Sequence, residues 1–245
     1  MREATAPPWP ARPALFLDFD GTLLEIAEEP SRVRPSPRLR ALLPELVPAT
    51  GGAVALISGR MIAEIDRLLD PHRFPVAGIH GLERRDAAGR RSAAQPSPAA
   101  FAAVREALLP FVERHPGLLL EDKRHALALH FRRRPDLAGE VRAAVAALDA
   151  RLPDELEVLP GRMVFEIKPR AASKGRAIES FMREPPFRGR TPVFLGDDVT
   201  DESGFAAVNA LGGVSVKVGR GETAAGWRLA DVEAVLDWLE RGVAS

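Results

Sequence analysis

Two aspartates, separated by one residue and placed directly after an apolar run, constrain this chain more than any other feature. The segment from Leu15 to Leu24 reads LFLDFDGTLL, with acids at Asp18 and Asp20. Such an apolar run predicts a buried strand, and side chains two apart on extended backbone point to the same side. Two carboxylates this close repel each other unless a cation or a shared proton intervenes. The sequence therefore predicts a bound metal ion, or a shared proton, at the edge of a sheet.

The composition excludes several classes of protein. The 245 residues include 34 Lys and Arg and 34 Asp and Glu, so there is no net charge to attract nucleic acid or an anionic membrane. Cysteine is absent, which rules out disulfides and thiolate metal sites and suits a reducing compartment. No apolar run approaches the roughly 18 residues that cross a bilayer, and the proline-rich N-terminus does not resemble a signal peptide. We expect a soluble cytoplasmic protein with no nucleic-acid or membrane partner.

Short apolar runs alternate with helical stretches in the first and last thirds of the chain. Continuous apolar character over four or five residues is typical of parallel strands covered on both faces. The expected strands are Ala14–Leu17, Ala53–Ile57, Pro75–Ile79, Val193–Leu195 and Val214–Val218. The expected helices are Pro37–Leu46, Met61–Leu69, Ser173–Met182 and Glu202–Leu211. This alternation predicts an α/β protein with a doubly wound, Rossmann-like parallel-sheet core.

The middle of the chain predicts an inserted α+β cap domain. A helix followed by two strands occurs twice, at Pro98–His115, Leu118–Glu121 and His125–Arg132, and again at Pro135–Leu152, Leu156–Leu159 and Met163–Lys168. The strands alternate, so helices should cover the apolar face and leave a polar face that carries Arg132, Glu166 and either Glu121 or Lys123. The expected boundaries are 1–83 for the first part of the core, 84–168 for the cap and 169–245 for the second part of the core.

Polar side chains from four segments should meet at the carboxyl edge of the core sheet, where open α/β sheets bind ligands. They are Asp18 and Asp20, Ser58 in ISGR, Lys174 in SKGRA, and Asp197, Asp198 and Asp201 in GDDVTDE. Carboxylates without histidine or cysteine favour magnesium over zinc. Lys174 opens a helix, where a cation opposes the helix dipole, so it needs an anionic partner.

Each of these features also has a purely structural interpretation. Acids after a strand often form turns, and Ser58 can cap the following helix. Asp201 suits the first turn of a helix. His80 can be a structural histidine, and the polar face of the middle sheet can simply be solvated. These structural interpretations, taken together, do not explain why all four segments are expected at the same edge of the sheet.

The motifs resemble those of a known family. LDFDGTLL, ISGR, a lysine that opens a helix, and LGDDVTDE resemble, in this order, the four motifs of the haloacid dehalogenase-like phosphatases. Three further segments look more narrowly like the trehalose-6-phosphate phosphatase family: GIHGLE at 78–83, EDKRHALALHFR at 121–132, and GRMVFEIKPRAASKGRA at 161–177. Lys168 stands where that family usually has an arginine.

The resemblance implies a magnesium-dependent hydrolysis of trehalose 6-phosphate. It makes Asp18 the nucleophile that forms an aspartyl-phosphate, and Asp20 the general acid and base. It makes Lys174 the cation that screens Asp18 from the phosphate dianion, and Ser58 a hydrogen-bond donor to a phosphoryl oxygen. The metal site that it implies comprises Asp18, the backbone carbonyl of Asp20, and Asp197, with Asp198 and Asp201 orienting metal-bound water or Lys174.

The expected substrate is a small phosphorylated disaccharide, whose hydroxyls need paired donors and acceptors. The expected substrate-binding residues are Gly59, Arg60, His80 and Gly81 in the core and Glu121, Lys123, Arg132 and Glu166 in the cap, with His130 as a further candidate. A trehalose-6-phosphate synthase is an expected functional partner. The alternatives are a phosphatase for sucrose phosphate, mannosylphosphoglycerate or glucosylglycerol phosphate, a phosphohexomutase, and a non-catalytic sugar-phosphate-binding regulator.

Overall fold

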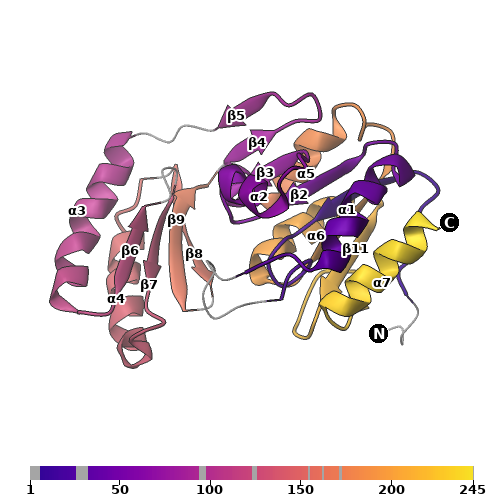
Figure 1. Ribbon diagram of the computed structural model, residues 1–245. Coiled ribbons are helices and arrows are strands. Elements are labelled where there is room, and N and C mark those ends of the chain that lie inside the picture. The colour runs from indigo at the N-terminus through magenta and orange to yellow at the C-terminus, as the bar shows by residue number, and fades with distance from the viewer. Residues whose placement is uncertain are drawn as a thin grey trace. The chain divides into compact units, whose positions relative to one another are not determined.

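The chain forms two units, each with its own sheet (Figure 1). The computed structural model describes residues 6–25, 33–93, 98–122, 126–153, 155–161, 163–170 and 173–244. The first unit comprises Met1–Ser92 and Ser173–Ser245, and the second comprises Ala93–Ala172. The second unit is therefore an insertion within the first, and it is drawn in magenta to salmon in Figure 1.

The first unit is built on an eight-stranded sheet with the order β12-β11-β10-β1-β2-β3-β4-β5. All neighbouring strands from β12 to β3 run parallel, whereas β4 is antiparallel to β3. The strands are β1 (Pro13–Leu17), β2 (Val54–Ile57), β3 (Val76–Gly78), β4 (Glu83–Arg85), β5 (Arg91–Ala93), β10 (Thr191–Gly196), β11 (Val214–Val218) and β12 (Trp227–Leu229). The direction of strand addition reverses beside β1, which confirms the predicted doubly wound α/β core.

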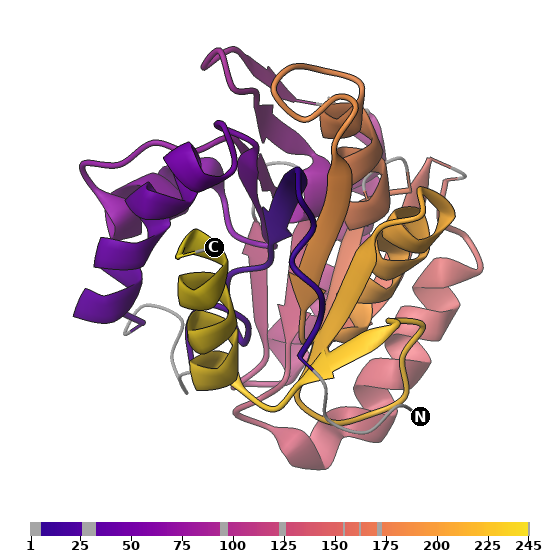
Figure 2. The ribbon, with the colours of Figure 1, turned by 90° about the vertical axis from the view of Figure 1, so that its right-hand side faces the viewer.

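Helices cover both faces of this sheet (Figure 2). On one face lie α1 (Pro37–Ala49), α2 (Ile62–Leu69) and α7 (Val232–Val243), and on the other lie α5 (Lys174–Met182) and α6 (Glu202–Ala210). The start of α1 follows from its sequence, because the Ser36 hydroxyl accepts a hydrogen bond from the Leu39 backbone N–H at 3.1 Å. Leu39, Leu43 and Leu46 then recur at helical spacing and are buried against the sheet.

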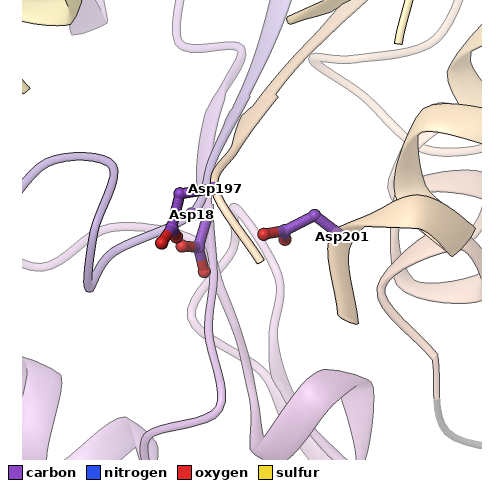
Figure 3. Close-up of side chains that lie close together, drawn as sticks. All are labelled: Asp18, Asp197 and Asp201. Carbon is purple, nitrogen blue, oxygen red and sulfur yellow. The ribbon is translucent and has the colours of Figure 1, made fainter. Parts of the chain in front are cut away.

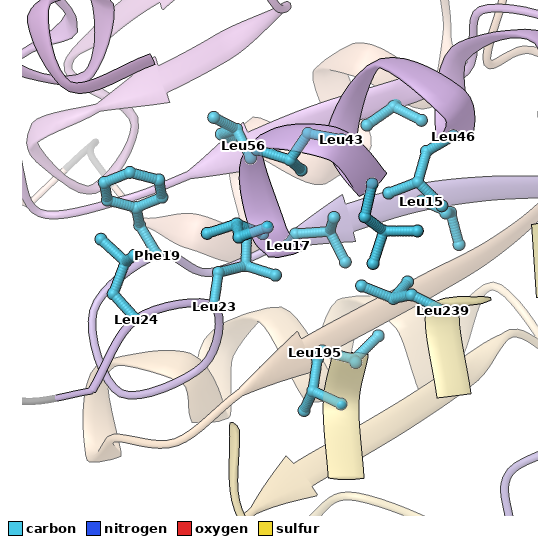
Figure 4. Close-up of a cluster of buried hydrophobic side chains, with 14 of the residues drawn as sticks. Leu15, Leu17, Phe19, Leu23, Leu24, Leu43, Leu46, Leu56, Leu195 and Leu239 are labelled. Carbon is cyan, nitrogen blue, oxygen red and sulfur yellow. The ribbon is translucent and has the colours of Figure 1, made fainter. Parts of the chain in front are cut away.

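The strand β1 supplies side chains to both apolar layers of the core. Leu15 and Leu17 lie in the cluster that also holds Leu43 of α1 and Leu239 of α7 (Figure 4). Phe16 points to the opposite face, where its ring stacks on Phe187 with centroids 5.4 Å apart. A strand buried on both faces explains why this segment reads as a continuous apolar run.

The second unit is a four-stranded antiparallel sheet with the order β6-β7-β9-β8. Leu127, Leu129, Phe131 and Ile167 form one apolar face, and they share a core with residues of the two helices. The elements are α3 (Pro98–Arg114), β6 (Leu119–Asp122), β7 (Leu127–His130), the short helix η3 (Pro135–Leu137), α4 (Ala138–Asp149), β8 (Leu156–Gly161) and β9 (Val164–Pro169). The predicted alternation of two faces is thus present.

Across the described ranges, no helix is both long and apolar enough to span a bilayer.

Several elements differ from the sequence-based expectations. Residues 84–92, expected in the cap, lie in the first unit, because β4 pairs with β3 and extends its sheet. The strands β4, β5 and β12 and the helix α7 were not predicted. Strand β4 reads ERR and β5 reads RSA, so both lack the apolar signal of a strand. Helix α1 runs to Ala49, three residues beyond the expected end.

Truncating Phe16 should destabilise the first unit selectively. A Phe16→Ala change removes a fully buried ring from a packed aromatic layer, which costs about 3 to 5 kcal/mol of unfolding free energy. Urea unfolding followed by tryptophan fluorescence measures this, because Trp9, Trp227 and Trp238 all belong to the first unit.

Val47→Ala serves as the control, because Val47 is 38% exposed on α1 and its truncation should change the free energy by less than about 0.5 kcal/mol. A Phe16→Ala protein that unfolds at the same urea concentration as the control would contradict the packing described above.

Candidate active site

The candidate active site lies in the first unit, at the carboxyl ends of the neighbouring strands β1 and β10. Leu17 is paired with Leu195, and the Asp18 backbone N–H donates to the Leu195 carbonyl at 3.0 Å. Asp18 and Asp197 therefore follow the two central strands at the same edge. Connections leave this point in opposite directions, which is where open α/β sheets leave room for a ligand.

Three carboxylates and one ammonium group form the centre of the site. Asp18, Asp197 and Asp201 each contribute an oxygen, and these oxygens lie within 4.8 Å of one another (Figure 3). The Lys174 Nζ donates to Asp18 Oδ1 and to Asp201 Oδ1, both at 2.6 Å. All but Asp197 are almost completely buried. The cation at the start of α5 thus has the anionic partners that its position requires.

Burial and mutual repulsion perturb these carboxylates. Burial raises the pKa of Asp18 well above its ordinary value of 3.8, an effect that Lys174 opposes and Asp201 reinforces. Burial likewise raises the pKa of Asp197 to about 6, again with a contribution from Asp201. Burial by itself lowers the pKa of Lys174, but Asp18 and Asp201 outweigh it and raise the value. The Lys174 ammonium group therefore stays charged, whereas the negative charge of the carboxylates is only partly offset.

This donor set fits a divalent cation with oxygen ligands. One ammonium group between two carboxylates leaves negative charge in excess, and in the described part of the chain no ammonium bond reaches the Asp197 carboxylate. The cluster found among the described residues contains carboxylates alone, which suits magnesium or another hard cation better than zinc. Asp18, Asp197 and Asp201 are the side chains that would hold the ion.

A cavity of about 300 Å³ borders this cluster. Its lining begins at Gly21 and Asp197 and continues to Arg220 and Asp231. The volume is at the lower end of that of small-molecule sites. The less buried side of Asp197 therefore adjoins open space rather than packed side chains.

Thr22 and Gly21 hold the acidic cluster together from the loop after β1. The fully buried Thr22 hydroxyl lies 3.2 Å from Asp18 Oδ2 and 3.5 Å from Asp197 Oδ1. Gly21 has φ +84°, and a Cβ there would lie 2.1 Å from an oxygen of Asp197. Only glycine fits so close to Asp197 in this conformation. Thr22 is part of the LDFDGTLL motif but was not among the expected site residues.

Lys217 is a second buried cation that the sequence argument missed. Its Nζ donates to the backbone carbonyl of Asp197, and the side chain is only 5% exposed. Lys217 is adjacent to Gly196 in the register of β10 and β11, so the bond holds the segment that carries Asp197. A lone charge inside VSVKV, a segment expected to form a buried strand, was the available signal.

Asp198 lies outside the acidic cluster and shapes its backbone. The Asp198 backbone N–H donates to Asp201 Oδ2 at 2.9 Å, and the Asp198 side chain accepts from the Asp201 backbone N–H. This reciprocal pair starts the short helix η4 (Val199–Asp201). Asp201 therefore combines the helix-start role with its bond to Lys174, and Asp198 itself is exposed.

The carboxylate of Asp20 faces Arg60. Both oxygens of Asp20 accept from the guanidinium of Arg60 at 2.6 Å, in a two-bond arrangement that fixes orientation. Burial lowers the pKa of Arg60, but Asp20 outweighs it, so the pKa rises. Asp18 and Asp20 thus have different partners, Lys174 and Arg60, although they lie only two residues apart.

Ser58 follows β2 and is almost completely buried. Its hydroxyl oxygen accepts from the Arg60 backbone N–H at 3.1 Å, whereas helix α2 begins after Met61 without a side-chain cap. Ser58 is therefore not the cap of α2. Accepting that bond leaves its hydroxyl proton for another acceptor.

The other candidate residues of the core lie directly beside this loop. His80 is buried, and its imidazole lies against Gly59. Gly81 approaches the backbone of Ser173, the residue before Lys174. The structure thus gathers the ISGR and GIHG motifs and the start of α5 in one place.

Two of the candidate sugar-binding side chains, Glu121 and Glu166, lie on one face of the sheet of the second unit. The register places Glu121 and Glu166 on either side of Ala128, so both acids lie on the face opposite the apolar core. His130 Nε2 lies 2.8 Å from Glu121 Oε2. Arg132 is exposed just after β7. Lys123 lies outside the described residues. Lys168, two residues after Glu166 on β9, is buried and paired with Glu157 at 2.8 Å.

Comparison with known proteins gives a consistent result. The family model described as trehalose-phosphatase matches residues 16–233. Trehalose-6-phosphate phosphatase of Escherichia coli strain K12 is 47% identical over 230 residues, which cover 94% of this chain and 86% of that protein. A probable trehalose-phosphate phosphatase of Sinorhizobium fredii is 43% identical over 206 residues, covering 84% of this chain and 77% of that protein.

A solved structure shows the same fold. The C-terminal domain of the C. albicans trehalose-6-phosphate phosphatase superposes with a TM-score of 0.87. The match covers 96% of this chain and 93% of that domain at 24% sequence identity. The predicted resemblance to this group of proteins is confirmed.

Metal binding should change how stability depends on pH. The pKa of Asp197 is higher in the folded protein, about 6, than its ordinary 3.8, so the folded state binds this proton more tightly. Without metal, this group's ionisation should lower stability as pH rises from 3.8 through about 6. Thermal unfolding at pH 5 and pH 7, with and without magnesium, tests this, and magnesium should stabilise more at pH 7.

Asp197→Asn is the control, because it removes the titrating group. We expect its melting temperature to lose most of the response to magnesium. An equal response to magnesium in the variant and the wild type at pH 7 would contradict the assignment of this carboxylate to the cation.

Proposed function

The chain belongs to the trehalose-phosphatase family, and from this premise we propose that it hydrolyses trehalose 6-phosphate to trehalose and phosphate through an aspartyl-phosphate on Asp18. The observation that carries the proposal is the pair Asp18 and Lys174 at the switch point of the sheet. A carboxylate oxygen 2.6 Å from a buried ammonium group can approach a phosphate dianion without uncompensated repulsion.

In the first step, an Asp18 oxygen attacks phosphorus as the bond from phosphorus to the sugar oxygen breaks. The leaving sugar oxygen takes a proton from Asp20, and trehalose departs. In the second step, water attacks the phosphorus of the aspartyl-phosphate and gives its proton to Asp20. The acyl phosphate bond then breaks, which restores the Asp18 carboxylate and releases phosphate.

The contacts of Asp18 suggest which oxygen reacts. Oδ1 accepts from Lys174 and Oδ2 lies near Thr22 at the longer distance of 3.2 Å. We assign the attack to Oδ2, because its weaker bond leaves more electron density available. Lys174 then stays bonded to Oδ1 and offsets the charge that gathers around the phosphoryl group.

Asp20 and Arg60 form the proton-transfer part of the site. Arg60 holds both oxygens of Asp20, so the orientation of this acid depends on a residue 40 positions away. We propose that the guanidinium turns one of its N–H groups to the phosphoryl group when substrate binds, which releases an oxygen of Asp20 for the sugar oxygen. Ser58 and Gly59 lie on the same loop and complete the phosphate contacts.

We propose magnesium as the cation. When bound, it neutralises charge on the transferring phosphoryl group. Asp18, Asp197 and Asp201 would hold it, together with the backbone carbonyl of Asp20 that the resemblance implies. Asp198 would act on metal-bound water or through its bonds with Asp201.

We assign recognition of the sugar to the polar face of the second unit. Glu121 and Glu166 supply acceptors for hydroxyls, and Lys123, Arg132 and His130 supply donors. A disaccharide with many hydroxyls suits such paired ionic groups better than an apolar pocket. The proposal places the reaction in the cytoplasm, where a trehalose-6-phosphate synthase would supply the substrate.

Replacing the nucleophile should abolish turnover without unfolding the protein. Asp18→Asn keeps the shape of the side chain but lacks the charged oxygen needed for attack. Phosphate release from trehalose 6-phosphate with magnesium should fall below detection, while the urea midpoint stays near or above that of the wild type.

The same assay on sucrose phosphate, mannosylphosphoglycerate and glucosylglycerol phosphate separates the related sugar phosphatases. Steady turnover by Asp18→Asn would remove this residue from the nucleophile role. Preferred hydrolysis of another sugar phosphate by the wild type would replace trehalose 6-phosphate as the substrate.

Removing an acid from the polar face of the second unit should weaken substrate binding. For Glu121→Gln and Glu166→Gln we expect KM for trehalose 6-phosphate to rise about tenfold, in keeping with the loss of a charged hydrogen bond. Affinity for inorganic phosphate should stay unchanged, because phosphate lacks the sugar.

Glu113→Gln is the matched control, because Glu113 is exposed on α3, which covers the opposite face of that sheet. Wild-type KM values in both acid variants would show that this face does not bind the sugar.

A further inference from the structure

The turn after β3 contains two consecutive non-glycine residues with positive φ. Ile79 has φ 47° and His80 has φ 54°, and both are buried. A β-branched residue is a true outlier in this region, and two non-glycine residues there in succession strain the backbone. A turn of this kind persists only where its surroundings fix it.

Backbone hydrogen bonds tie this turn to the loop that carries Ser58 and Arg60. The His80 N–H donates to the Ser58 carbonyl at 2.9 Å, and the Ile79 N–H donates to the Arg60 carbonyl at 3.0 Å. Just beyond the turn, a Glu83 carboxylate oxygen accepts from the Ile62 N–H at 3.1 Å. The loop is thus bonded to the turn at both ends of its three-residue span.

The imidazole of His80 fills the space beside the middle residue of that loop. A Cβ on Gly59 would lie 2.9 Å from both Cε1 and Nε2 of His80. That distance is shorter than the contacts that a Cβ atom makes with other heavy atoms, so the ring lies against the loop at a point where glycine fits best. The positive φ of His80 is the backbone conformation that comes with this placement.

The other end of the turn contacts the segment that positions Lys174. Gly81 has φ 103°, and a Cβ there would lie 3.0 Å from the Ser173 carbonyl oxygen and 3.3 Å from Ala177 Cβ. Ser173 is the N-cap of α5, and its hydroxyl accepts from the Arg176 N–H at 3.1 Å. The turn therefore touches both the Ser58–Arg60 loop and the start of α5.

We infer that the Ile79–Gly81 turn sets the spacing between the two phosphate-binding segments, with His80 as a positioning residue that acts through the Ser58–Arg60 loop. This inference rests on the proposed function, because it assigns Ser58, Arg60 and Lys174 to the phosphoryl group. The strain at Ile79 and His80 is then the cost of a rigid connection between groups that must hold one small anion. His80 acts from behind the loop, without contacting the substrate.

His80→Asn tests the role of the ring, because asparagine tolerates left-handed backbone but is smaller. We expect kcat for trehalose 6-phosphate to fall on the order of tenfold to a hundredfold, as displacements of about 1 Å can cause. Calorimetric titration of the magnesium-loaded protein with inorganic phosphate should show an affinity about tenfold lower. His72→Asn, which removes an imidazole elsewhere in the same unit, should leave both quantities unchanged.

A double-mutant cycle separates positioning from direct contact with the substrate. Gly59→Ala places a methyl group where the ring lies, so it should lower phosphate affinity strongly in the wild type but only slightly in His80→Gly, which lacks the ring. Additive effects, or a His80→Asn protein with wild-type kcat and phosphate affinity, would overturn the inference. A wild-type protein that binds phosphate but does not hydrolyse trehalose 6-phosphate would contradict the proposed function and leave this inference standing.

Discussion

The buried contact of Lys174 with Asp18 and Asp201 is the interaction on which the rest of the site depends. A carboxylate removed from water is stable only with a charged or hydrogen-bonded partner. Here the partners come from three segments more than 20 residues apart, so the folded sheet and helix α5 must form before any of the charges is compensated. The position of β1 between β10 and β2 brings these segments to one edge.

Around this contact the chain departs from the burial and backbone preferences that it follows in the rest of the fold. The core strands are apolar on both faces and helix α1 starts with a regular serine cap, whereas the sheet edge combines buried charges, an acid pair and positive φ at Ile79 and His80. Such departures concentrate at functional sites, where the remainder of the fold supplies the stability that they cost. The carboxyl edge of the sheet can therefore be recognised as a functional site from its unfavourable local features as well as from its reactive side chains.

The sequence predicted the layered core and the segments of the site because both leave strong local signals. Apolar runs followed by acids placed Asp18 and Asp197 at strand ends, and the helix-dipole argument required a partner for Lys174. The hairpin of β4 and β5 was missed because its arginines pair with acids distant in sequence, such as Arg85 with Asp66 and Arg84 with Glu184. The bond of Arg60 to Asp20 and the packing of His80 on Gly59 depend on side-chain placement, which periodicity does not encode.

The insertion of the second unit between β5 and α5 has a consequence for synthesis on the ribosome. Residues 93–172 are contiguous, so the second unit can fold as soon as it emerges, whereas the first unit is split around it. Until β10 is made, the edge of β1 that pairs with it is bare, and Asp197, which follows β10, is absent. The nascent chain must therefore keep an apolar strand and a lone acid soluble until Thr191–Gly196 is made, and the 80 residues of the second unit lengthen that interval.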